Sequence, residues 1–154
     1  MRLVALLVTM VVVSACGGGG NSPTAPTPAT PTVTGQYTGT YRIDNCTETG
    51  AASGFCIAIG TGGGHVFTPQ QSGSNLAGTM AVGGFNFPVS GSVGTDNVVA
   101  LSGGGQLIPG ANLSLSTWRG NLIGSTIAGS MQFVITTTDP FGSATVRGTF
   151  SITK

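Results

Sequence analysis

Few side chains in this sequence belong to the types that carry out acid–base or nucleophilic chemistry. His65 is the single histidine; it sits in a glycine-rich loop, and no carboxylate stands beside it. The acidic residues are typical of turns and loops: Asp44, Glu48, Asp96 and Asp139. Catalysis by an acid and a base, or by a nucleophile that histidine activates, requires such groups to be held together. The sequence therefore predicts that the protein is not an enzyme.

The N-terminal residues carry a specific signal. Arg2 is followed by an apolar run over residues 3–13, about half of the roughly 20 residues that a membrane-spanning helix needs. The next residues, Val13-Ser14-Ala15-Cys16, resemble the lipobox of bacterial lipoproteins. The resemblance implies cleavage before Cys16, acyl chains on this cysteine, and a lipid anchor in the cell envelope. Because Gly17 follows it instead of Asp, the outer membrane is expected in a Gram-negative cell. The alternative is an ordinary cleaved signal with an incidental cysteine.

Composition then divides the chain into three parts. Residues 1–15 form the expected lipoprotein signal peptide, and residues 16–34 a tether rich in Gly, Pro and Thr that is expected to be disordered or nearly so. Proline-rich chain extends by about 3.1 Å per residue, so the tether would hold the domain roughly 40 to 50 Å from the lipid. Residues 35–154 are a normal length for one domain with a single core.

With Cys16 assigned to lipid, Cys46 and Cys56 remain as an even pair in an oxidising compartment. We expect them to form a disulfide. By closing a loop of about ten residues, the disulfide would stabilise the domain by roughly 3 kcal/mol or slightly less in the chain-entropy model. A metal site is the alternative, but two thiolates need further ligands and the domain offers only His65. No metal and no cofactor is therefore expected.

The charge of residues 35–154 excludes one class of partner. Four basic residues, Arg42, Arg119, Arg147 and Lys154, balance the four acidic ones, and they form no basic cluster in the sequence. Nucleic-acid binding depends on clustered Lys and Arg. The expected partners are the membrane, through the lipid on Cys16, and either an envelope protein or a small hydrophobic ligand.

A five-residue pattern recurs along the domain: an apolar residue, any residue, Gly, Ser or Thr, and a second apolar residue. The copies are 37–41, 76–80, 89–93, 127–131 and 146–150. In a strand, the Gly and both apolar residues share one face, so each glycine interrupts an inner face and permits curvature. Together with period-two alternation throughout, this predicts an all-β domain. About eight strands would form an antiparallel up-and-down meander that closes into a small barrel, and a two-sheet β-sandwich is the alternative.

The expected strands follow from the alternation and the turn residues. The first spans about residues 36–43, residues 55–59 form a possible short strand, and residues 65–71 are extended with Pro69 at an end or edge. The clearest hairpin joins 75–82 to 85–93 through Gly83-Gly84. Later strands are expected at 98–102, where the glycine run 103–105 breaks the strand, at 112–119 and 126–136, and after the turn at 139–142. Trp118 has the wrong parity for the inner face, so either a bulge re-aims it or the indole lies outside.

Two of the repeats resemble known barrels. Tyr37-Thr38-Gly39-Thr40-Tyr41 and Leu76-Ala77-Gly78-Thr79-Met80 resemble the Leu-Thr-Gly-Thr-aromatic strands of avidins, and Gly39-Thr40-Tyr41 is similar to the Gly-x-Trp of lipocalins. The resemblance implies a barrel that coils and closes in the same way. It carries over no ligand-binding residue, because avidin sites need several tryptophans and this chain has one. The overall pattern is closer to the small secreted barrels of bacterial lipoproteins.

The inward-facing side chains are the remaining candidates for a function. The candidate ligand-lining residues are apolar with two hydroxyls: Tyr37, Tyr41, Met80, Phe85, Phe87, Met131, Phe133 and Phe150. If they fill the barrel, the domain has a structural or interaction role in the envelope and presents its rim loops to a partner. The alternative is that the inner glycines leave room for one small apolar ligand near Tyr41 and Phe85.

Overall fold

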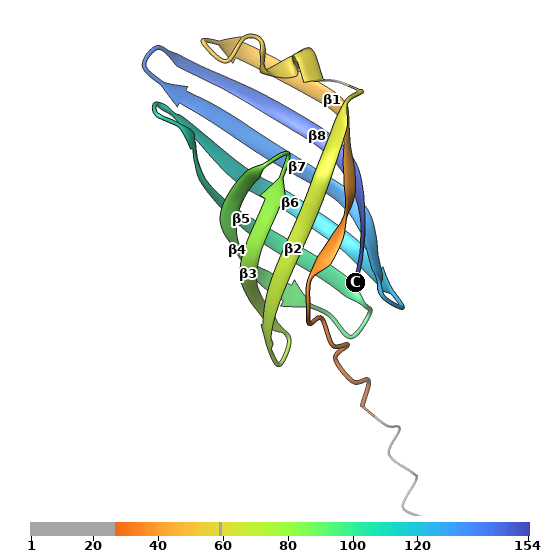
Figure 1. The fold of residues 1–154 in the computed structure, drawn as a ribbon. Coiled ribbons are helices and arrows are strands. Elements are labelled where there is room, and N and C mark those ends of the chain that lie inside the picture. The colour runs from red at the N-terminus through yellow and green to blue at the C-terminus, as the bar shows by residue number, and fades with distance from the viewer. Residues whose placement is uncertain (1–26, 59) are drawn as a thin grey trace, which may run out of the picture.

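The computed structural model describes residues 27–58 and 60–154, and over these ranges the chain forms a closed barrel of eight antiparallel strands (Figure 1). Each strand pairs with the next along the chain, and β8 closes the barrel on β1. The strands are β1 Tyr37–Gly50, β2 Gly62–Ser72, β3 Asn75–Val82, β4 Phe85–Val93, β5 Val98–Ile108, β6 Ala111–Ile123, β7 Thr126–Thr138 and β8 Phe141–Thr153, with a single 3-10 turn, η1 Phe55–Ala58, between β1 and β2. The up-and-down barrel is confirmed, and the two-sheet alternative is wrong.

The glycines of the repeated pattern lie where neighbouring backbones approach closely. A Cβ atom added at any of the five would collide with a backbone carbonyl oxygen of an adjacent strand. The pairs are Gly39 with Ser151, Gly78 with Thr68, Gly91 with Ala100, Gly129 with Arg119 and Gly148 with Arg42. Strongly coiled strands bring backbones this near only where no side chain intervenes. The recurring glycine is therefore a requirement of barrel closure.

The glycine run at 103–105 does not break the strand, contrary to the expectation from sequence. β5 continues through it to Ile108 and pairs with β6 along the way. A Cβ at Gly103 would collide with the carbonyl oxygen of Pro88, and one at Gly104 with that of Leu113. These glycines accommodate close neighbours on both sides, so they bend the strand without ending it.

The segment at residues 55–59 was also predicted wrongly as a possible strand. Its described part is the 3-10 turn η1. The preceding strand is longer than expected, because β1 runs past Ile43 to Gly50 with a register irregularity between Ile43 and Asn45. The chain then passes through η1 into β2.

Pro69 occupies the edge position that its missing N–H requires. The pairing of β2 with β1 ends at Phe67, opposite Tyr37, so Pro69 lies beyond the start of β1. On its other side it pairs with Gly78 of β3. No ladder hydrogen bond toward β1 is lost at this position.

A β-bulge decides the orientation of Trp118. The register between β6 and β7 shifts between Leu115 and Thr117, so that Ser116 is the extra residue. The shift reverses the inward parity of the rest of β6, and the indole is 1% exposed. Of the two alternatives left open by the sequence, the bulge is the correct one.

One end of the barrel is closed by residues that precede β1. Val33, which composition alone places in the tether, is fully buried, and its N–H donates to the side-chain oxygen of Gln71. Gln71 in turn donates to the carbonyl oxygen of Pro31 over 2.9 Å. In Figure 1 this segment lies at the end of the barrel opposite η1. The interior is packed at this end.

Candidate functional site

An apolar pocket of about 240 Å³ opens at the η1 end of the barrel. Every strand except β2 contributes to its wall or rim, and η1 covers part of the mouth. The lining residues are Tyr41, Ile43, Phe55, Val82, Gly83, Phe85, Leu107, Leu113, Met131, Phe133, Ile135 and Val146. Eleven of the twelve carry no polar side-chain group, so the site is built to contact hydrocarbon.

Simple alternation along the long strands places most of these side chains. On β7, Met131, Phe133 and Ile135 are each buried, whereas the residues between them are half-exposed. The shorter wall is the β3–β4 hairpin, whose turn residues Gly83 and Gly84 have φ values of +57° and +92°. This left-handed geometry favours glycine and allows the two-residue turn that was expected from sequence.

A buried aromatic cluster lies next to the pocket and meets it at Tyr41, whose ring packs on His65. The rings of Trp118 and Phe150 stack with centroids 4.1 Å apart and planes inclined by 16°. Phe67 and His65 pack on the same indole at 5.9 and 6.1 Å. Aromatic contacts of this kind add to the stabilisation from burial.

His65 belongs to this cluster and lies in β2, in agreement with the extended segment expected at residues 65–71, whereas the glycine-rich stretch before it is part of the strand and not a loop. Its side chain is fully buried, and its Nε2 accepts a 3.1 Å hydrogen bond from the indole N–H of Trp118. Accepting at Nε2 places the ring proton on Nδ1, which has no partner among the described residues. Burial lowers the pKa of His65 to about 4, so the imidazole is neutral at pH 7.

Tyr41 supplies the one side-chain polar group of the pocket wall. Its hydroxyl lies against the β3–β4 turn, because a Cβ added at Gly83 would be 2.7 Å from the phenolic oxygen. A Cβ added at Gly63 would be 3.2 Å from the same atom. The ring also meets His65 edge-on with centroids 6.5 Å apart. The two glycines therefore make room for the tyrosine hydroxyl.

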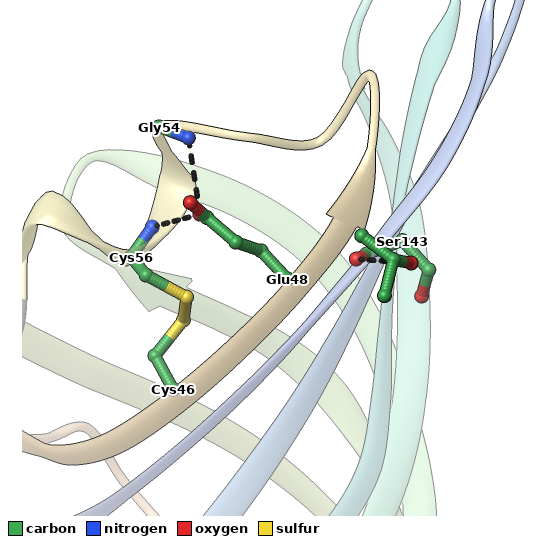
Figure 2. Close-up of a disulfide and its surroundings, with 6 residues drawn as sticks. Cys46, Glu48, Gly54, Cys56 and Ser143 are labelled. Atoms are coloured by element: carbon green, nitrogen blue, oxygen red, sulfur yellow. Dashed lines mark hydrogen bonds between the residues drawn. A yellow bond between two sulfur atoms is a disulfide. The ribbon is translucent and has the colours of Figure 1, made fainter.

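The loop after β1 is held over the mouth by a disulfide and a carboxylate, as Figure 2 shows. The expected Cys46–Cys56 disulfide is confirmed, with the two Cα atoms 5.4 Å apart. Oε2 of Glu48 accepts hydrogen bonds from the backbone N–H of Gly54 at 3.0 Å and of Cys56 at 2.9 Å. Phe55 lies between these two donors and lines the pocket. Glu48 and the disulfide thus hold the backbone on both sides of Phe55, whose side chain covers part of the pocket mouth.

The eight side chains proposed from sequence as ligand-lining divide into two groups. Tyr41, Phe85, Met131 and Phe133 line the pocket. The others are at most 5% exposed and pack within the filled interior: Tyr37, Met80, Phe87 and Phe150. The two groups differ in their position along the barrel axis. The alternation of the sequence shows which side chains face inward, but it does not show how far along the axis they lie.

Eight of the twelve lining residues were not among the candidates from sequence, and for two of them, Leu107 and Phe55, the reason can be identified. Leu107 shares its parity with Leu101, and extending the strand through the intervening glycines would have placed it inward. Phe55 reaches the pocket from a loop, and only the cysteine that follows it hinted at its position. Cys16, the predicted lipidation site, lies outside the described residues, as does most of the tether.

Exposed apolar side chains surround the mouth. Phe85 is 44% exposed, Ile108 53% and Phe141 74%. They stand at the β3–β4, β5–β6 and β7–β8 turns, which all lie at the open end. Ile123, the fourth large exposed apolar side chain among the described residues, ends β6 at the opposite end of the barrel. Apolar surface is therefore concentrated around the pocket.

Within residues 27–58 and 60–154, no three His, Cys, Asp or Glu side chains are grouped as metal ligands. Over the same ranges, no helix has the length and apolarity needed to cross a membrane. The chain matches no model of a protein family, and comparisons with curated proteins and with solved structures give no match either.

Proposed function

We propose that this barrel binds a small apolar molecule in the pocket at its η1 end. The observation that supports the proposal is an open cavity of about 240 Å³ with an apolar lining in an otherwise filled interior. An engineered apolar cavity of about 150 Å³ stays dry and accepts benzene, so this volume suits a ligand of one ring or one short hydrocarbon chain. Pockets for drug-sized ligands start at about 300 Å³, so a larger ligand would extend past the mouth.

The role that we propose is non-catalytic. Two of the chemically active side chains already have structural roles: His65 is neutral and packed in the core, and Glu48 accepts two backbone hydrogen bonds. Carrying or sensing a ligand requires only a preformed apolar site.

A second candidate function is attachment to an envelope protein through the rim. The exposed side chains of Ile108 and Phe141 support it, because more than half of each is in contact with solvent and neither is needed to pack the barrel interior. Both lie at the tips of long hairpins that extend beyond the β3–β4 turn in Figure 1. Reproducible crosslinking from these tips in intact cells is the test, and its absence would remove this candidate.

For location, we propose a lipid-anchored protein of the cell envelope, at the outer membrane if the cell is Gram-negative. The Cys46–Cys56 disulfide is compatible with an oxidising compartment. The segment nearest to Cys16 among the described residues enters at the closed end, opposite η1. The tether to an anchor on Cys16 would therefore leave the barrel from the end opposite the pocket.

Titration of the purified full-length protein with toluene, followed by ¹H–¹⁵N NMR, tests ligand binding. We expect shifts confined to residues around the pocket and a Kd of about 1 mM or below, which is reasonable for seven heavy atoms. Leu113→Trp should fill the pocket and abolish the shifts. Asn112→Trp is the matched control, since Asn112 is the adjacent residue of β6 and is exposed on the outer face. No shifts in the wild type, or equal binding by the Leu113→Trp variant, would refute the proposal.

A further inference from the structure

The polar groups around the pocket define the chemistry of a ligand more narrowly than its volume does. This step rests on the proposed function. We infer that the ligand is a neutral molecule whose apolar body carries one hydrogen-bond-accepting oxygen, directed at the hydroxyl of Tyr41. Ketones, esters, ethers and aldehydes belong to this class.

Neutrality follows from the absence of a counter-charge. No charged side chain lines the pocket. The charged side chains of β1, which contributes Tyr41 and Ile43 to the wall, are already engaged: Arg42 pairs with Asp44 at 3.8 Å on the exterior, and Glu48 is occupied by two backbone donors. A carboxylate or ammonium group inside would lose its hydration without a partner, which is unfavourable. The portion of the ligand that enters the pocket is therefore uncharged.

The requirement for an oxygen follows from Tyr41. Among the described residues, none forms a hydrogen bond with its hydroxyl, and the side chain is half-buried, so water in the open pocket is the partner that remains. A ligand that displaced this water without replacing its hydrogen bond would leave a polar group unsatisfied. Because a phenolic O–H is a good donor, an acceptor atom on the ligand is the best replacement.

The backbone supports a dedicated position for this hydroxyl. Gly63 lies in β2 and Gly83 in the β3–β4 turn, yet both lack a side chain where one would press on Tyr41. The ring is also held from below by His65, with centroids 6.5 Å apart. The donor is therefore placed on the wall in advance of binding, which lowers the cost of orienting it.

Three probes of similar shape separate these requirements: acetophenone, α-methylstyrene and benzoate. α-Methylstyrene replaces the carbonyl oxygen of acetophenone by a methylene group, and benzoate adds a charge. Each is titrated by NMR against the full-length wild type and Tyr41→Phe, which removes only the hydroxyl. In Tyr41→Phe we expect the Kd of acetophenone to rise about three- to tenfold, the magnitude of one hydrogen bond, and that of α-methylstyrene to stay within a factor of two. Benzoate should not bind the wild type at pH 7.

The outcomes distinguish this inference from the function on which it rests. Equal effects of Tyr41→Phe on acetophenone and α-methylstyrene would overturn the role of the hydroxyl while leaving apolar binding intact. Benzoate binding as tight as that of acetophenone would overturn neutrality, and this comparison needs only the wild type. If none of the three probes nor toluene bound the wild type, the proposed function itself would fail.

Discussion

The indole N–H of Trp118 donates a 3.1 Å hydrogen bond to Nε2 of His65, and this bond crosses the interior of the barrel. Trp118 lies in β6 and His65 in β2, which are separated by three strands in either direction around the closed sheet. Opposite walls of the barrel are therefore joined by two rings in direct contact.

The buried imidazole predicts a loss of stability in mild acid. The pKa of His65 is about 4 in the folded protein and near 6.5 in an unfolded chain, so below pH 6.5 the unfolded state binds the additional proton. Stability is then complete above pH 6.5 and falls by up to about 1.4 kcal/mol per pH unit as the pH decreases toward 4. Urea unfolding at pH 7.5 and pH 5 measures the difference, which should be about 2 kcal/mol.

His65→Gln is the control for this pH dependence, because an amide oxygen still accepts from the Trp118 N–H and does not titrate. The variant should be less stable at pH 7.5 and should show a much smaller loss between pH 6.5 and 5. An equal slope in the variant and the wild type would assign the effect to the carboxylates instead.

The bulge at Ser116 predicts the effect of deleting one residue from β6. Because Ser116 is the extra residue of β6 opposite β7, its deletion should remove the bulge and leave Trp118 with inward parity. Since Trp118 is the only tryptophan, acrylamide quenching of the intrinsic fluorescence reports its position directly. The deletion variant should remain as poorly quenched as the wild type. Strong quenching in a folded deletion variant would show that the strand accommodates the change in another way.

The close approach of neighbouring backbones predicts that replacing glycine by alanine destabilises the domain at some positions and not at others. Gly129→Ala would drive a methyl group against the carbonyl oxygen of Arg119 and should destabilise the domain by about 2 kcal/mol or more. Gly64→Ala is the comparison, since a Cβ added there has no atom within 4 Å and the backbone is not left-handed. It should change the free energy of unfolding by no more than about 0.5 kcal/mol. Similar losses at both sites would argue against the role of the glycine in coiling.

The fastened loop predicts a link between the disulfide and the pocket. Replacing both Cys46 and Cys56 by Ser should destabilise the domain by about 2 to 3 kcal/mol, because the cross-link no longer restricts the unfolded chain. It should also weaken toluene binding, since Phe55 is then held only through Glu48 and its backbone partners. Chemical unfolding and NMR titration measure the two effects. Unchanged toluene affinity would show that Phe55 needs no disulfide to cover the site.

The proposed anchor is tested at Cys16. Substitution Cys16→Ser should leave the precursor unprocessed and prevent incorporation of radioactive palmitate in the bacterial cell. Cys46→Ser in the same assay should be labelled like the wild type, because it leaves the lipobox intact. Labelling of the Cys16→Ser variant would end the lipoprotein proposal.

Much of the architecture was determined by local sequence. Alternation placed the inner faces of β3, β4, β7 and β8, the glycine pair at 83–84 placed the hairpin turn, and the repeated glycine indicated closure. These features depend on the two-residue period of a strand and on the absence of a Cβ, and both can be read within a few residues. The cysteine pair likewise identified the disulfide.

Only the tertiary structure decided where the barrel is full and where it is hollow. Alternation shows that Tyr37 and Tyr41 both face inward, but the first is packed and the second lines a pocket. The difference arises because the free volume at each height is set by side chains from all eight strands together, including an indole turned inward by a bulge and a phenylalanine brought over the mouth by a distant cysteine. The repeat of a single strand does not contain this combined volume. For this reason only the folded chain shows the pocket and the buried histidine next to it.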